Sequence, residues 1–79
     1  MPRYFFTIYD DLVSEDEEGR DLPDVETAKA EAIKGARELM CEELRNGRLV
    51  LRDHHIEVVD EVGKRVADIA FKDVIRIEG

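Results

Sequence analysis

The side chains best suited to binding an ion form an acidic run at positions 14–19, SEDEEG. Oxygen-bearing side chains ahead of a glycine are typical of calcium-binding loops. An EF-hand loop that began at Ser14 would need a bidentate glutamate at its twelfth position, where the chain has Val25, and a helix before it, where a strand is expected. The run therefore favours a solvated acidic loop, with a weak divalent-cation site as the alternative, and we predict no dedicated metal site.

Side chains that act as nucleophiles or bases are few in this sequence. His54 and His55 are adjacent, so in a strand they point to opposite faces and cannot chelate one metal ion together; each is expected at a strand edge. Cys41 is expected on the polar side of a helix, and no spacing supplies it with the base and oxyanion site that a reactive thiol needs. The chain also has no G-x-S-x-G, P-loop or G-x-G-x-x-G motif. We predict no catalytic residue and no cofactor, and the sequence favours a protein that is not an enzyme.

One long periodic segment, from Asp24 to Asn46, organises the rest of the chain. Its apolar residues recur on one stripe of a helix turning about 100° per residue, and they are Val25, Ala28, Ala32, Ile33, Ala36, Leu39, Met40 and Leu44. Asp24 is a suitable N-cap, and Asn46-Gly47 is a suitable stop. At about 1.5 Å per residue this helix is longer than a six-residue strand, so its last turn is expected to overhang the sheet.

Alternating apolar residues predict three strands around this helix. Residues 3–9 form the first, with Phe5 and Tyr9 on its outward face, and residues 54–59 and 64–71 form a hairpin closed at Gly63. The acidic stretch between the first strand and the helix is expected to be a loop with at most a brief edge strand at residues 19–21. Residues 72–78 fit a further strand or a helical turn equally well.

These elements predict one small α+β domain spanning residues 1–79. The fold class is a two-layer sandwich in the order β(β)αββ, in which an antiparallel sheet of three to four strands carries the helix on one face. Leu49, Val50 and Leu51 are expected to cap the end of the core beneath the helix overhang. The uncovered face is a candidate interface, formed by Phe5, Tyr9, Val59 and Val66. The alternative is that scattered apolar residues on an exposed sheet face have no function.

Charge is distributed unevenly along the chain. The net charge is −8, and residues 10–26 hold nine acids and one base, so this segment carries the whole imbalance. Nucleic acid is an unsuitable partner because phosphate binding needs a positive surface. A basic protein is the natural complement, and its candidate docking loop is Glu15, Asp16, Glu17 and Glu18.

The sequence also bears on location. The apolar run at the N-terminus is too short for a signal peptide, and no segment approaches the roughly 18 apolar residues that a membrane span needs. A single cysteine allows no intrachain disulfide, which suits a reducing compartment. We expect a cytoplasmic protein that does not act at a membrane.

Four segments carry a resemblance to known proteins. The opening MPRYFF (1–6), DEEG (16–19), the helix entry LPD (22–24) and the hairpin EVVDEVG (57–63) together resemble a family of short bacterial domains of unknown function. The resemblance implies the fold and a bacterial cytosolic origin, and it brings no functional residues. The order of strand, acidic loop, LPD and alanine-rich helix is also distantly similar to the start of HicB-type antitoxins, although in this chain a strong hairpin follows the helix.

Two functions are compatible with these features. The first is a noncatalytic binding or assembly module, which forms a homodimer or docks a protein partner through the exposed sheet face. The alternative is an antitoxin-like regulator whose acidic loop binds a basic protein.

Overall fold

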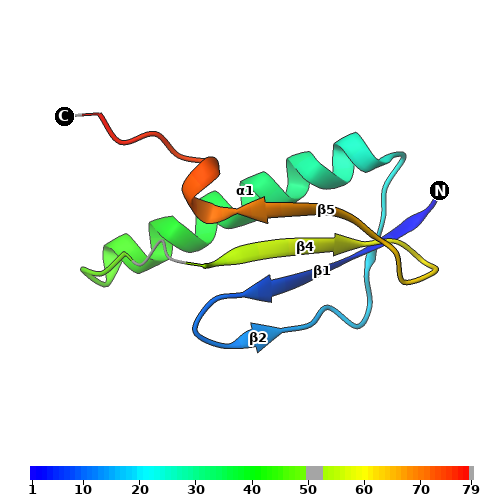
Figure 1. Cartoon of the computed structure of the whole chain (residues 1–79), viewed down its shortest axis with the longest axis horizontal. Coiled ribbons are helices and arrows are strands. Elements are labelled where there is room, and N and C mark those ends of the chain that lie inside the picture. The colour runs from blue at the N-terminus through cyan, green and yellow to red at the C-terminus, as the bar shows by residue number, and fades with distance from the viewer. Residues whose placement is uncertain (50–52, 79) are drawn as a thin grey trace.

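The computed structural model describes residues 1–49 and 53–78, and it has two layers, an antiparallel sheet and one long helix (Figure 1). The elements are β1 (Arg3–Tyr9), β2 (Val13–Ser14), β3 (Arg20–Asp21), α1 (Val25–Arg45), β4 (His55–Val59), β5 (Arg65–Ala70) and the 3₁₀ turn η1 (Phe71–Asp73). The order across the sheet is β2-β1-β4-β5, and β3 also pairs with β1. The predicted α+β fold, with a helix packed on an antiparallel sheet, is confirmed.

Strand β1 lies between β4 and the two short strands. Its alternation places Tyr4 in the core at 4% exposure, with Phe6 and Ile8 packed against the core on the same face. Strand β4 contributes Ile56 and Val58 to that face, and both are buried. In both strands, alternate residues therefore point into the core, and the residues between them point to the other face of the sheet.

Helix α1 begins and ends with the capping groups that the sequence predicts. The carboxylate of Asp24 accepts a hydrogen bond of 2.8 Å from the backbone N–H of Thr27, which satisfies one free donor of the first turn. At the other end, the N–H of Gly47 donates to Leu44 O and that of Arg48 to Glu43 O, the two bonds of a Schellman motif. Gly47 has φ +79°, a conformation that glycine adopts without steric cost.

The buried side of α1 consists largely of small side chains, which let the helix lie close to the sheet. Its buried residues are Ala28, Ala32, Ala36 and Met40. The largest fully buried side chains are Phe71 and Val58, which come from η1 and β4. Leu44 is 58% exposed, as expected for a last turn that extends past the sheet.

The sheet has five strands in the described part of the chain, where three to four were predicted. Strand β2 was not expected, because two residues are too short to show an alternation, and only its pairing with Ile8 and Tyr9 defines it. The ambiguous C-terminal segment starts as a helical turn, since Phe71–Asp73 forms η1. Of the predicted core cap, Leu49 packs against the core, whereas Val50 and Leu51 lie outside the described residues.

Candidate functional site: the outer face of the sheet

The sheet face opposite the helix is built from cross-strand pairs of β1 and β4. Phe5 lies opposite Val59, and Tyr9 lies opposite His55. Directly opposite residues of an antiparallel pair project from the same face, so these four side chains share the outer face. All four are half-buried. The face is therefore uncovered by the helix but partly closed by its own side chains.

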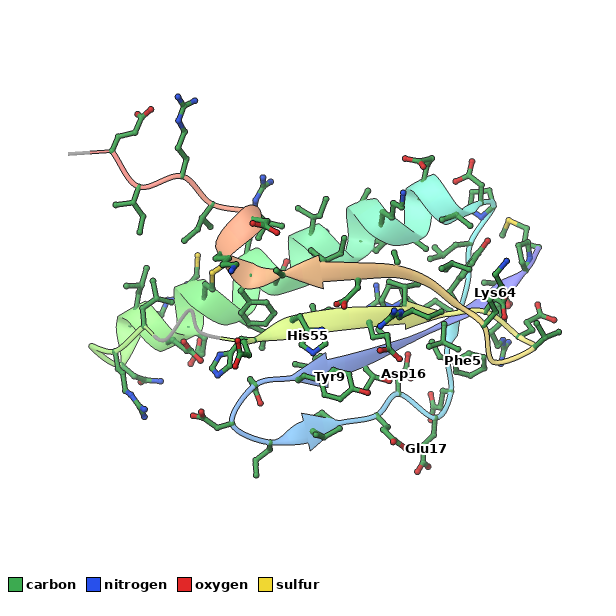
Figure 2. The ribbon with its side chains drawn as sticks, viewed as in Figure 1. Phe5, Tyr9, Asp16, Glu17, His55 and Lys64 are labelled. Carbon is green, nitrogen blue, oxygen red and sulfur yellow. The ribbon has the colours of Figure 1, made fainter. Side chains whose placement is uncertain are left out.

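One end of this face holds an aromatic stack. The rings of Tyr9 and His55 lie 4.5 Å apart between centroids, with an interplanar angle of 17° (Figure 2). His55 Nδ1 is 2.5 Å from Asp68 Oδ1. Arg65 Nη1 lies 3.6 Å from Glu57 Oε2 and 3.8 Å from Asp68 Oδ2. An aspartate fixes the orientation of the imidazole, as it does in general-base dyads, but the structure shows no nucleophile hydrogen-bonded to His55 among the described residues. These contacts therefore hold the side chains of this end of the face in place.

Val66 does not belong to the outer face, and its predicted position there is wrong. The register between β4 and β5 shifts at Val58 and Val59, which places Arg65 opposite Val59 and Ala67 opposite Val58. Val66 is the extra residue of this bulge, and it packs against the core. The prediction assumed that side chains alternate strictly between the two faces along the strand. A bulge breaks this alternation, so the prediction placed Val66 on the wrong face.

The acidic loop runs beside the outer face. β2 pairs with one end of β1 and β3 with the other, so residues 15–19 span the edge of β1 between them. Asp16 Oδ1 accepts hydrogen bonds of 3.2 and 3.1 Å from the N–H groups of Glu18 and Gly19 and so shapes the turn. Figure 2 shows Asp16 and Glu17 on the same side of the molecule as Phe5 and Tyr9. The acidic loop therefore lies next to the outer face.

Gly19 is the point at which the loop touches β1. Its φ is +75°, and a β-carbon there would lie 2.9 Å from both the Tyr4 carbonyl oxygen and Phe5 Cε1. Only a residue without a side chain fits this contact, because the Tyr4 oxygen is backbone and cannot move aside alone. Gly19 therefore holds the acidic loop against the ring of Phe5.

The substitution Gly19→Ala is expected to lower the free energy of unfolding by about 1–3 kcal/mol, because it combines a left-handed backbone with a steric clash. Urea unfolding measures this loss. Gly63→Ala is the matched control, since Gly63 has φ +85° but nothing within 4 Å of the added carbon. An equal loss in the two variants would show that the loop does not press on β1.

An ion pair between Arg3 and Asp21 connects β1 to β3, at the C-terminal end of the acidic loop. Arg3 Nε and Nη2 bind the two carboxylate oxygens of Asp21 at 3.1 and 3.4 Å, and Arg3 Nη1 donates to Glu18 O at 3.0 Å. Hydrogen bonding from Arg3, and then its charge, hold the pKa of Asp21 below the ordinary value. The same bond and charge raise the pKa of Arg3. The guanidinium therefore ties β3 and the loop to β1.

This ion pair predicts a pH dependence of stability. A carboxylate whose pKa is lower in the folded state contributes stability that is complete above its unfolded pKa, near 3.9, and lost as pH falls through the folded value. The difference in urea midpoint between the wild type and Asp21→Asn should be constant from about pH 5 upward and shrink below about pH 4. A difference that grows on acidification would contradict the assignment.

The other residues singled out in the sequence lie away from this face. Cys41 is exposed on α1. His54 was expected at a strand edge, but it is buried at 7% exposure just before β4, with its ring edge-on to Phe71 at 5.9 Å. Its Nε2 lies 3.5 Å from Asp11 Oδ1, and its Nδ1 is buried without a hydrogen-bond partner in the described part of the chain. The His54 ring is therefore part of the packed interior next to Phe71.

Neither a metal-binding cluster nor a membrane-spanning helix is present in residues 1–49 and 53–78. These residues include no cluster of three or more histidine, cysteine, aspartate or glutamate side chains that is arranged to hold a metal ion. They also include no helix that is long and apolar enough to cross a membrane.

Together, the fold and the outer face define a class, a small α+β domain with one helix, an uncovered sheet face and an acidic loop beside that face. The chain belongs to the family DUF6894, a domain of unknown function, whose model matches residues 3–72. The predicted membership in a family of unknown function is thereby confirmed. No curated protein and no solved structure matches the chain.

Proposed function

We propose that this protein is a noncatalytic binding module that docks a basic segment of another protein on the outer face of its sheet. The observation that carries the proposal is the position of the acidic loop, which Gly19 holds against Phe5 on that face. A partner would meet apolar and negatively charged groups on one continuous surface.

The charge of this surface comes from the loop. On the strands, Glu57 and Asp68 are both within 4 Å of Arg65, so their charge is partly balanced. On the loop, the side chains of Glu15 and Glu17 are exposed and form no hydrogen bond or ion pair with any described residue. Charges that lack an internal partner are available to a ligand and increase its association rate. The partner that fits has lysine or arginine residues next to an apolar anchor for Phe5 and Val59.

A basic partner fits this surface better than a second copy of the chain. Each copy carries a net charge of −8, and a dimer formed through this face would bring two acidic loops toward one interface. Like charges at an interface disfavour association. An antitoxin that binds a basic protein would be one module of this kind, and the HicB resemblance stays a prediction.

A designed peptide tests the docking proposal. The probe is a fluorescent peptide of alternating lysine and leucine residues, and its dissociation constant is measured by anisotropy. Glu17→Lys is expected to weaken binding about fivefold, the upper range for an exposed charge pair, and Phe5→Ser is expected to weaken it at least as much. Asp73→Lys is the matched control, because Asp73 is an exposed acid on η1, away from the loop.

Three outcomes would overturn the proposal. One is the absence of peptide binding. Another is an equal loss in Glu17→Lys and Asp73→Lys, which would show that net charge alone attracts the peptide. The third is a wild-type homodimer that Phe5→Ser converts to a monomer, which would make a second copy the occupant of this face.

A further inference from the structure

A second candidate site lies on the opposite, inner face of β1. Helix α1 packs mainly across β4 and β5, so the inward side chains Phe6 and Ile8 of β1 are only partly covered. The space between β1 and the helix is a cleft of about 260 Å³. Its apolar lining consists of Phe6, Ile8, Ala32, Gly35, Leu39 and Ile56.

Gly35 keeps this cleft open. A glycine within a helix costs about 1 kcal/mol relative to alanine, and the backbone of Gly35 does not require it, because its φ is not positive. Space does not require it either, since an added β-carbon would meet only Ile56 Cδ1, at 3.9 Å. A larger side chain at position 35 would instead occupy the cleft. Gly35 therefore lowers helix stability while it preserves an apolar cavity.

The rim of the cleft carries charges of both signs. Arg20 lies over the ring of Phe6, 5.2 Å from its centroid, and its Nη1 is 3.3 Å from Glu31 Oε2. Lys34 and Glu38 line the adjoining polar hollow with Arg20 and Glu31. The side chains of Lys34 and Glu38 form no hydrogen bond or ion pair with any described residue. One ammonium and one carboxylate are thus left for a ligand, beside an apolar floor.

We propose that the cleft binds a free α-amino acid with an aromatic side chain. The zwitterion complements the rim, because its ammonium pairs with Glu38 and its carboxylate with Lys34. The volume of the cleft fits such a ligand. A cavity of about 150 Å³ holds benzene, and the 260 Å³ of the cleft leaves room for a ring and its substituent. A simple amine or a simple acid would leave one rim charge unpaired. The site lies on the opposite face of the sheet from the docking surface, so it stands independently of the proposed function.

Titration of the ¹⁵N-labelled protein with L-phenylalanine tests this site. We expect saturable shifts of the amides of Phe6, Ile8, Gly35 and Ile56, and binding of phenethylamine and of 3-phenylpropionate at least threefold weaker, because each lacks one charge. Glycine, which has no ring, is expected to produce no shifts. The absence of saturable shifts, or shifts that map to the outer face, would overturn the proposal.

Two variants separate the cleft from nonspecific binding. Gly35→Leu is expected to abolish the shifts because its side chain fills the cavity, and Gly35→Ala, which adds one uncrowded carbon, shows whether the helix tolerates a side chain there. Glu38→Gln keeps the cavity and is expected to remove the preference for L-phenylalanine over 3-phenylpropionate. Unchanged binding in a folded Gly35→Leu variant, or an unchanged preference in Glu38→Gln, would contradict the assignment.

Discussion

Replacing Phe71 by alanine is expected to lower the free energy of unfolding by about 3–5 kcal/mol. Phe71 is 1% exposed and is one of the two largest fully buried side chains. Its ring packs edge-on against the buried His54, and its N–H donates a 3.0 Å hydrogen bond to His54 O, so it closes the end of the core after β5. At about 0.05–0.15 kcal/mol per residue, the whole chain is stable by roughly 4–12 kcal/mol. This single truncation therefore removes a large share of the total.

Urea unfolding followed by circular dichroism measures the loss. Ile77→Ala is the control, because Ile77 lies close in sequence but is 77% exposed, and its truncation should change stability by less than about 0.5 kcal/mol. A loss below about 1 kcal/mol in Phe71→Ala would mean that η1 does not seal the core as described.

The second large effect is expected at Ile56, whose truncation to alanine should cost about 2–3 kcal/mol. Substitutions of buried isoleucine by alanine cost about 2–5 kcal/mol, and the spread reflects the cavity left behind. Ile56 is 3% exposed, but it also lines the cleft beside Gly35. The space vacated by its side chain joins an open cleft that water can enter, so the cost should lie in the lower part of that range.

Ile56→Val is the graded companion, with an expected loss of about 0.5–1.5 kcal/mol. Both losses are read from urea midpoints at constant slope. A loss near 5 kcal/mol in Ile56→Ala would show that the cleft is closed in solution and that the vacated space stays empty.

Much of the fold could be predicted because its signals are local and strong. The helix from Val25 to Arg45 has a long apolar stripe with a capping residue at each end, and β1 has a full alternation over seven residues. Signals of this kind depend on neighbours in the sequence, and tertiary contacts reinforce them here.

The errors arose where tertiary contacts decide. Strand β2 is defined only by its pairing with β1. Val66 points inward because of a bulge that the alternation of apolar residues does not predict. His54 is polar, and the sequence alone does not reveal that Phe71 and Asp11 enclose its ring. Each of these features depends on a partner distant in the chain.

The candidate surfaces also combine features that the local sequence predicts with features that only tertiary contacts determine. Phe5, Tyr9 and Val59 could be placed on the uncovered face from their alternation, and the negative charge of the loop could be counted. The contact of Gly19 with Phe5, and the skewed position of α1 that leaves a cleft over β1, depend on three-dimensional packing. Of the signals for that cleft, only Gly35, a mid-helix glycine, was visible in the sequence.

The most direct test of the docking proposal is an amide chemical-shift map of the ¹⁵N-labelled protein, recorded as the lysine–leucine peptide is added. The proposal predicts saturable shifts concentrated at Phe5, Tyr9, Glu17 and Val59, which weaken as salt screens the charges. Shifts concentrated on the exposed side of α1, or spread evenly over every acidic residue, would contradict it.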